Sequence, residues 1–415
     1  MLKMSSPLKI SFKPTIGRTI NISLPLSKSE SNRGIAILYS LQEIELIKQI
    51  KWSDSTDTQL LLTSLQTKSD SFNFEDAGTP LRFALALQST NTEFRTLTGN
   101  KRLRERPLSD LLDSLKSNGA KIDFLELDNQ IPLRIKGPLN PNKIIEISGK
   151  QSSQHVSALM ILIATKFPES ILRIKDQIVS KSYVELTVNT LKTFGFEIIQ
   201  INNDLKFFRN KTINLKKFKV HGDWSAAGYF YLIQLMLPHL KITLSNLKGD
   251  SAQGDLITWK LFQKLGVETT FIGDEANLAK TTNSCKSFDE DFQSHPDLVP
   301  TFASACAYLG IEAIFRNIEI LRYKESDRIS AINSNLIQLG FELIEIESGT
   351  FKLVRTKTPK SPLKIKTQTD HRIAMAFAPW ALHLGNIYID NSNCVSKSFP
   401  NFWEEIKKFG VVLGL

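Results

Sequence analysis

The chain has 415 residues, 41% of them apolar and 23% charged, and its formal net charge is +10. A globular protein of this composition has room for two domains of about 200 residues each, and no stretch approaches the roughly 18 apolar residues of a membrane span. The positive charge would attract any polyanion, so it fits small phosphorylated substrates and nucleic acid alike.

Five clusters of small polar or cationic residues in the first half each stand directly before an apolar run that is typical of a helix. A helix N-terminus with hydroxyl groups and cations beside it suits a phosphate or a carboxylate, although each cluster alone fits ordinary helix capping as well. In chain order the clusters contain Lys28, Ser29 and Arg33; Gly78, Thr79 and Arg82; Arg106; Ser152, Ser153 and Gln154; and Ser180 and Tyr183.

The second half places titratable residues close together at predicted helix starts. Lys324 and Arg328 are four residues apart, which predicts one helical face for both, and a solvated ion-paired face is the alternative. Together with the earlier clusters, these residues predict a site that binds more than one multiply charged anion. Two carboxylates of this set can serve as acid and base. The residues concerned are Asp297, Lys324, Glu325, Arg328, the run Asp370-His371-Arg372, and Lys397.

A repeated helix ending is the most informative feature of the organisation. An apolar residue lies four positions before a glycine that opens a short apolar strand, at Gly119, Gly195, Gly266, Gly340 and Gly410, so the intervals are 76, 71, 74 and 70 residues. A glycine at this place is the usual stop of a helix before a strand. Near-constant spacing predicts a structural repeat of about 70 residues that mixes helices and strands, and residues 58–67 resemble a sixth copy without the glycine.

Taken in order, the motifs resemble the 5-enolpyruvylshikimate-3-phosphate synthase (EPSP synthase) family from about Leu24 to Pro400. The segments that carry the resemblance are LPLSKSESNR, AGTPLR, RP before a helix, SSQ, SKSY, PDLVPT, KESDR, DHRIAM and SKSFP. The resemblance implies an α/β fold of two similar domains, each of three βαβαββ units, known as the inside-out α/β barrel of enolpyruvyl transferases. It places one domain at residues 25–221, the other at 1–24 plus 222–415, and the active site in the cleft between them.

The resemblance also implies transfer of the enolpyruvyl group of phosphoenolpyruvate to the 5-hydroxyl of 3-phosphoshikimate. It assigns 3-phosphoshikimate to Lys28, Ser29, Arg33, Ser152, Ser153, Gln154, Ser180, Asp297 and Lys324. It assigns phosphoenolpyruvate to Lys28, Gly78, Arg106, Gln154, Arg328, Arg372 and Lys397, with Thr79, Arg82, Tyr183, Asp223 and His371 in support. Asp297 would take the proton of the 5-hydroxyl, and Glu325 or Lys28 would protonate the methylene carbon.

This chemistry needs no metal and no organic cofactor, and we expect a cytoplasmic monomer that binds these two small molecules and neither a membrane nor nucleic acid. The three cysteines, Cys285, Cys306 and Cys394, fit neither a disulfide framework nor a paired metal-ligand spacing, which predicts free thiols. Three positions depart from residues that are common in the family: Leu26 stands in place of glycine, Asp76 in place of asparagine and Ser182 in place of proline. These departures bear on substrate affinity more than on the reaction.

Two alternatives stay open. The enolpyruvyl transferase that acts on UDP-N-acetylglucosamine shares the architecture but typically uses a loop cysteine as acid, and no cysteine precedes Cys285 here. A basic nucleic-acid-binding protein, from another class, is favoured by net charge alone. Steep salt dependence of binding to a duplex would support it.

Overall fold

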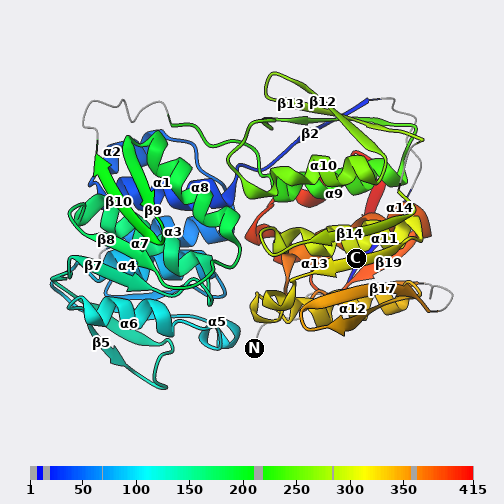
Figure 1. The fold of residues 1–415 in the computed structure, drawn as a ribbon. Helices are drawn as coiled ribbons and strands as arrows, with labels where there is room; N and C mark the ends of the chain where they lie inside the picture. The colour runs from blue at the N-terminus through cyan, green and yellow to red at the C-terminus, as the bar shows by residue number, and fades with distance from the viewer. Residues whose placement is uncertain are drawn as a thin grey trace. The chain divides into compact units, whose positions relative to one another are not determined.

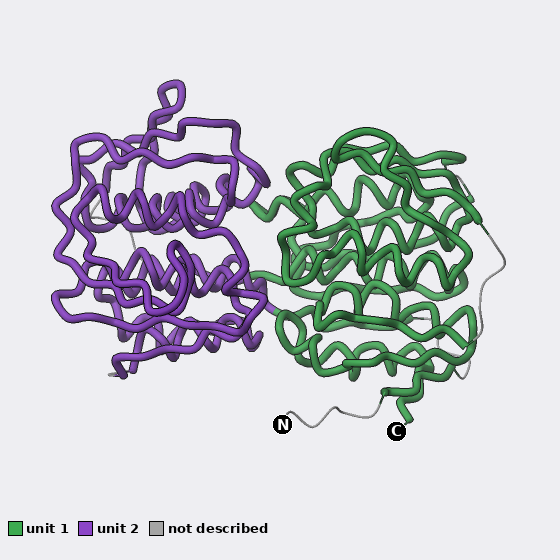
Figure 2. Tube along the Cα trace, turned by 90° about the horizontal axis from the view of Figure 1, so that it is seen from below, with its two compact units in different colours: residues 1–25, 221–415 green, residues 26–220 purple. Residues whose placement is uncertain are grey.

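Five four-stranded sheets with a common strand order organise the fold. The computed structural model describes residues 7–12, 19–67, 69–209, 218–282, 285–356 and 362–414. The chain divides into two compact units, one of Leu26–Val220 and one of Met1–Pro25 with His221–Leu415 (Figure 2). Each unit has a hydrophobic core of its own.

The elements of the first unit along the chain are α1 (Lys28–Ser40), α2 (Ile44–Gln49), α3 (Thr56–Gln66), β3 (Ser71–Asn73), α4 (Gly78–Gln88), β4 (Arg95–Thr98), α5 (Lys101–Arg104), α6 (Ser109–Ser117), β5 (Lys121–Phe124), β6 (Leu133–Lys136), β7 (Ile144–Ile147), α7 (Ser153–Lys166), β8 (Ile171–Ile174), α8 (Lys181–Thr193), β9 (Phe196–Ile201) and β10 (Asp204–Arg209).

The unit with both chain ends contains β1 (Leu8–Phe12), β2 (Thr19–Ser23), α9 (Trp224–Met236), β11 (Lys241–Ser245), the 3₁₀ helix η2 (Gly254–Ile257), α10 (Thr258–Lys264), β12 (Val267–Ile272), β13 (Glu275–Lys280), β14 (Ser287–Asp291), η3 (Pro296–Leu298), α11 (Val299–Leu309), β15 (Glu312–Arg316), η4 (Glu319–Tyr323), α12 (Arg328–Gln338), β16 (Phe341–Glu347), β17 (Thr350–Arg355), β18 (Leu363–Ile365), α13 (His371–Phe377), η5 (Ala378–Trp380), α14 (Ala381–Leu384), β19 (Asn386–Ile389), η6 (Ser392–Lys397), α15 (Phe402–Lys407) and β20 (Val411–Gly414).

Every sheet has the same topology, which Figure 1 lets the reader follow by label. In the sheet β7-β8-β10-β9, the first two strands are parallel and joined by a helix, and the last two are an antiparallel pair. This is the predicted βαβαββ unit, and it occurs five times in the described residues. Three copies lie in the unit with both chain ends, where β1 and β2 supply strands that the later chain lacks.

The glycine repeat is confirmed. Gly119, Gly195, Gly266, Gly340 and Gly410 have φ of 101°, 87°, 89°, 83° and 86°. They follow α6, α8, α10, α12 and α15 and open β5, β9, β12, β16 and β20, each at the edge of its sheet. A side chain is disfavoured at such φ, so glycine ends each helix and turns the chain into the strand. The sixth candidate, residues 58–67, lies largely in α3.

The helices inside each unit are apolar on nearly all sides. Twelve of the thirteen residues of α9 are buried, and α7 is buried along most of its length. A helix without a polar face is stable only when other elements surround it. α7 therefore packs with α1 and α4, and α11 packs with α9 and α13.

The repeat also explains where the polar motifs lie. Parallel strands end on one edge of a sheet, and the helix after each strand begins at that edge. Gly78 follows β3, Ser152 follows β7, Ser180 follows β8, Asp297 follows β14 and Arg372 follows β18. These five residues therefore lie near helix starts beyond the carboxyl ends of parallel strands, a place where α/β folds bind anions.

We predict that Gly340→Ala lowers the free energy of unfolding by about 1–2 kcal/mol, because alanine pays for the left-handed conformation that glycine adopts freely. Urea unfolding of the full chain measures it. Ser330→Ala, on an exposed position of α12, is the control and should change little. Equal stability of the two variants would contradict the role of the glycine.

Candidate active site

The turn before α4 and the segment before α6 meet at Arg106. Only 7% of Arg106 is exposed, and a Cβ at position 78 would collide with its guanidinium, so the cation lies directly on Gly78. Its Nε and Nη1 are buried and have no hydrogen-bond partner among the described residues. A buried cation with free donors is costly, and a bound anion removes that cost.

Arg82 binds the backbone of the two segments that meet at Arg106. It lies four residues into α4 and is buried. Its Nη1 donates to the Gly78 carbonyl at 3.0 Å, its Nη2 to the Pro107 carbonyl at 3.1 Å, and its Nε to Nε2 of His155 at 3.1 Å. The predicted supporting residue thus joins the starts of α4, α6 and α7.

Arg33 is a second buried cation, held by α1, α7 and α8. It donates to the Ser29 and Tyr183 carbonyls and to the hydroxyls of Ser157 and Thr187. Four of its five N–H groups are thereby used, and among the described residues one on Nη1 remains for a ligand. Burial lowers the pKa of Arg33 to about 10, with Tyr183 and Glu30 acting in the opposite sense.

The remaining predicted residues of this unit shape helix starts. Ser152 caps α7 by accepting from the Gln154 N–H at 3.2 Å, and Oε1 of Gln154 is buried without a partner among the described residues. Ser180 begins α8 at φ 53° and ψ 49°, a left-handed conformation that is uncommon for serine and is often found at functional sites. Lys28 donates to Asp57 at 3.0 Å.

In the other unit, three carboxylates converge on Arg328, the first residue of α12. Its side chain is fully buried and contacts Asp370 at 2.8 Å, Asp297 at 2.9 Å and Glu325 at 2.6 Å. Burial lowers the pKa of this guanidinium, but Asp370, Glu325 and Asp297 outweigh burial and raise it. Arg328 is therefore charged at any pH at which the protein folds.

Asp297 is surrounded by cations. Arg328 and Lys324 contact its Oδ1 at 2.9 and 3.3 Å, and Arg372 contacts its Oδ2 at 2.8 Å. Burial alone would raise the pKa of Asp297, but Arg372, Lys324 and Arg328 hold it well below the ordinary value, while Glu325 opposes them. The carboxylate is therefore ionised and paired with three cations.

The predicted helical face of Lys324 and Arg328 is wrong. Lys324 follows η4 in extended backbone, and α12 begins only at Arg328, with Asp327 as its cap. The two cations still meet, because both reach Oδ1 of Asp297. Tertiary structure brings them together, and helical spacing does not.

Three other predicted residues of this unit are buried near helix or strand ends. Asp223 caps α9 by accepting from the Ala226 N–H at 2.9 Å, and His371 begins α13 with its Nδ1 3.8 Å from Asp370. Lys397 is buried at the end of η6.

Two further predicted residues lie at helix starts of the first unit. Thr79 is the second residue of α4, and Ser153 is the first residue of α7, where it is buried.

Comparison with known proteins decides the family. The family model described as EPSP synthase (3-phosphoshikimate 1-carboxyvinyltransferase) matches residues 21–406. The chain belongs to the EPSP synthase family. A 3-phosphoshikimate 1-carboxyvinyltransferase from Bacteroides fragilis is 34% identical over 397 residues, 95% of this chain and 96% of that protein. One from Buchnera aphidicola subsp. Baizongia pistaciae is 31% identical, with 93% of this chain and 95% of that protein covered.

Two solved structures share this fold. The EPSP synthase from Acinetobacter baumannii has a TM-score of 0.71 at 19% identity, over 98% of this chain and 100% of that one. The enolpyruvyl transferase NikO from Streptomyces tendae has a TM-score of 0.70 at 14% identity, over 98% of each chain. The family resemblance of the motifs and the two-domain α/β fold are thus confirmed.

The sequence analysis gave three acidic residues no role: it named Asp370 only as part of its motif, and it did not single out Asp57 or Asp255. Asp370 both caps α13 and binds Arg328, and its place directly before a helix was the available signal. Asp57, which pairs with Lys28, gave no signal. Asp255 lies in η2, shortly before α10 begins, and gave no signal either.

Asp255 is a buried acid beside the cluster of Asp297. The Ser225 hydroxyl bonds its Oδ2, and its Oδ1 is buried without a partner among the described residues. Burial raises the pKa of Asp255 to about 6; Arg372 opposes this, Asp297 and Asp223 add to it, and the Ser225 bond lowers it. This acid therefore titrates near neutral pH.

Other structural findings concern the predicted absences and a separate cavity. The three cysteines are free, as predicted. No helix within the described ranges combines the length and apolarity needed to cross a bilayer.

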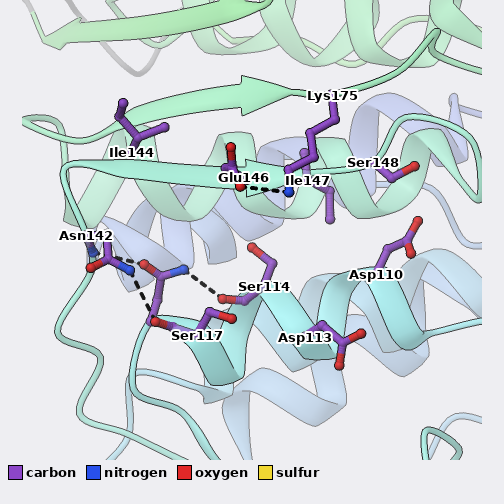
Figure 3. A pocket seen from close by; sticks show the side chains of 11 residues that line it. Asp110, Asp113, Ser114, Ser117, Asn142, Ile144, Glu146, Ile147, Ser148 and Lys175 are labelled. Carbon is purple, nitrogen blue, oxygen red and sulfur yellow. Dashed lines mark hydrogen bonds and ion pairs between the residues drawn. The ribbon is translucent and has the colours of Figure 1, made fainter.

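Figure 3 shows a cavity of about 280 Å³ between α6 and β7, where Lys175 pairs with Glu146 at 2.7 Å. None of the residues that line it is a predicted site residue.

We predict that Asp255→Asn changes the pH dependence of stability. The pKa of Asp255 is about 6 in the folded chain and about 3.9 in the unfolded chain. Folding is therefore accompanied by proton uptake at about pH 4 to 6, and stability falls as the pH rises through this range. Asparagine cannot ionise. The free energy of unfolding of the variant minus that of the parent chain should therefore increase by roughly 2–3 kcal/mol from pH 4 to pH 7.

Urea unfolding at several pH values measures this difference, with Asp250→Asn, an exposed acid of the same loop, as control. A difference between Asp255→Asn and the parent that is constant with pH would show that Asp255 has an ordinary pKa.

Proposed function

We propose that this enzyme transfers the enolpyruvyl group of phosphoenolpyruvate to the 5-hydroxyl of 3-phosphoshikimate and releases phosphate. The observation that carries the proposal is Arg106, a buried cation that lies on Gly78 with two free donors. Family membership supports the reaction, and buried cations with unused donors support the binding of its anionic substrates. The cytoplasmic location and the monomeric state remain predictions.

Phosphoenolpyruvate, with a phosphate and a carboxylate, is assigned to cations from both units. Arg106 lies on Gly78, and its Nε and Nη1 have no partner among the described residues, so both are left to donate to an oxyanion. Arg372 and Arg328 converge on Asp297, so an anion that displaces this carboxylate gains two ready-made donors. Lys28, Gln154 and Lys397 complete the proposed set.

3-Phosphoshikimate is assigned to the starts of α1, α7 and α8. Ser152, Ser153 and Ser180 are hydroxyl donors at helix N-termini, where phosphate binding is favoured by free N–H groups. Arg33 has one N–H left, and Ser29 and Gln154 lie at the starts of α1 and α7. Asp297 and Lys324 would contact the ring from the other unit.

The proposed reaction is an addition followed by an elimination. Asp297 takes the proton of the 5-hydroxyl as its oxygen bonds to C2 of phosphoenolpyruvate, and Glu325 or Lys28 gives a proton to C3. The tetrahedral adduct then loses a proton from C3 while the bond between C2 and the phosphate oxygen breaks. Fixed cations stabilise the charge that develops, so the protein supplies proton transfer and electrostatic stabilisation.

Asp297 can act as a base only when the substrates bind the cationic side chains that otherwise pair with it. With Arg372, Lys324 and Arg328 bonded to it, its pKa lies well below the ordinary value, and such a carboxylate is a weak acceptor. Phosphate and carboxylate groups that bind the same cations would weaken these bonds and raise the pKa. The base is thus activated by the binding of its substrates.

The acceptor decides between this proposal and its nearest rival. We expect phosphate release from phosphoenolpyruvate when 3-phosphoshikimate is added and none with UDP-N-acetylglucosamine. A coupled phosphate assay with each acceptor in turn measures this. Turnover with the nucleotide sugar would show that the acceptor has been assigned wrongly, and binding to duplex DNA that weakens steeply with salt would favour the nucleic-acid-binding class.

We predict that Asp297→Asn lowers kcat by about a hundredfold or more, because the amide keeps the shape of the side chain but cannot accept the proton. Calorimetric titration should show that 3-phosphoshikimate still binds. Asp289→Asn, on an exposed ion pair of β14, is the control and should leave kcat unchanged. A normal kcat for Asp297→Asn would refute its role as base.

A further inference from the structure

The imidazole of His155 is buried between two cations of the phosphoenolpyruvate half of the site. It is the third residue of α7, next to the proposed ligand Gln154, and none of its surface is exposed. Nε2 lies 3.1 Å from Nε of Arg82. No role was assigned to this residue by the motifs of the sequence.

The contact fixes the tautomer of His155. An arginine side chain only donates hydrogen bonds, so Nε2 must accept, and the single proton of the ring resides on Nδ1. Burial first, and then the charges of Arg82 and Arg106, lower the pKa of His155 well below its ordinary value; the Pro107 backbone opposes them. The ring is therefore a neutral acceptor.

A neutral acceptor at this point orients Arg82. With Nε directed at His155, the guanidinium plane directs Nη1 to the Gly78 carbonyl and Nη2 to the Pro107 carbonyl. The Gly78 carbonyl lies in the first turn of α4 and the Pro107 carbonyl just before α6, next to Arg106. The chain of contacts thus runs from the imidazole through Arg82 to the anion-binding guanidinium.

We propose that His155 is a positioning residue for phosphoenolpyruvate, which acts as a neutral hydrogen-bond acceptor that fixes Arg82 and, through the Gly78 and Pro107 carbonyls, holds Arg106 in place. A carboxylate here would pair with Arg82 and weaken the field of Arg106 on an anion. A residue without an acceptor would leave a buried N–H of Arg82 unsatisfied. Neutral histidine supplies the acceptor for Arg82 without a charge, at the cost of its own Nδ1, which is buried without a hydrogen-bond partner among the described residues.

The proposal rests on the proposed function and is tested by two matched variants. His155→Gln places an amide oxygen near the position of Nε2, and His155→Phe keeps a ring but has no acceptor. We expect the KM for phosphoenolpyruvate to rise tenfold or more in the phenylalanine variant and to stay within about threefold in the glutamine variant. The KM for 3-phosphoshikimate should change less than about threefold in both.

Loss of folding alone would lower the active fraction and not the KM, so the KM comparison separates positioning from structure. His239→Phe, an exposed histidine in the other unit, is the control for the substitution. If His155→Phe does not fold, His155→Asn replaces it, because its shorter amide does not reach Arg82. Equal KM values for phosphoenolpyruvate in the variants with and without the acceptor would overturn the proposal.

Two further measurements complete the test. In an Arg82→Lys background, which lacks the Nε donor, the glutamine and phenylalanine variants should have the same KM; a persisting difference would overturn the route through Arg82. Nitrogen NMR of the imidazoles should show a neutral Nδ1–H ring that does not titrate between pH 5.5 and 8 and that disappears in His155→Gln. A titrating ring would also overturn it. This readout needs no turnover, so it stays informative if the reaction itself has been assigned wrongly.

Discussion

The fold places its functional groups through one constraint: two parallel strands in every sheet end at the same edge, and a helix begins beyond each of them. Because five sheets share this order, helix N-termini recur at corresponding places along the chain. Gly78 after β3 and Arg328 after β15 are far apart in sequence but occupy such places in their repeats. Free N–H groups at helix starts favour anions, so a repeat that was built for packing also supplies sites for phosphates and carboxylates.

Much of this was predictable from the sequence because glycine, helix and strand leave local signals. The helix stops at Gly195 and Gly340 were found from spacing, and both have the positive φ that the stop requires. The motifs identified the family, which the comparisons confirm. Local signals of this kind are strong because they depend on backbone conformation within a few residues.

The ion pairs were not predictable in the same way, since they depend on where distant segments meet. Lys324 and Arg328 were expected on one helical face, yet they meet only because both reach Asp297, about 30 residues earlier in the chain. Asp370 reaches Arg328 from another repeat. Sequence patterns name the charged residues, and tertiary structure decides which of them are partners.

The buried cations fall into two kinds, and the direction of their pKa shifts shows the difference. Arg328 has three carboxylates around it, and its pKa is raised; Arg33 is held by hydroxyls and carbonyls, and burial lowers its pKa to about 10. A cation of the first kind must exchange partners before it binds an anion, which couples binding to the release of Asp297. A cation held by neutral groups has no counterion to displace and can bind an anion directly. Nε and Nη1 of Arg106 have no partner among the described residues, so an anion that binds these donors would displace no carboxylate from them.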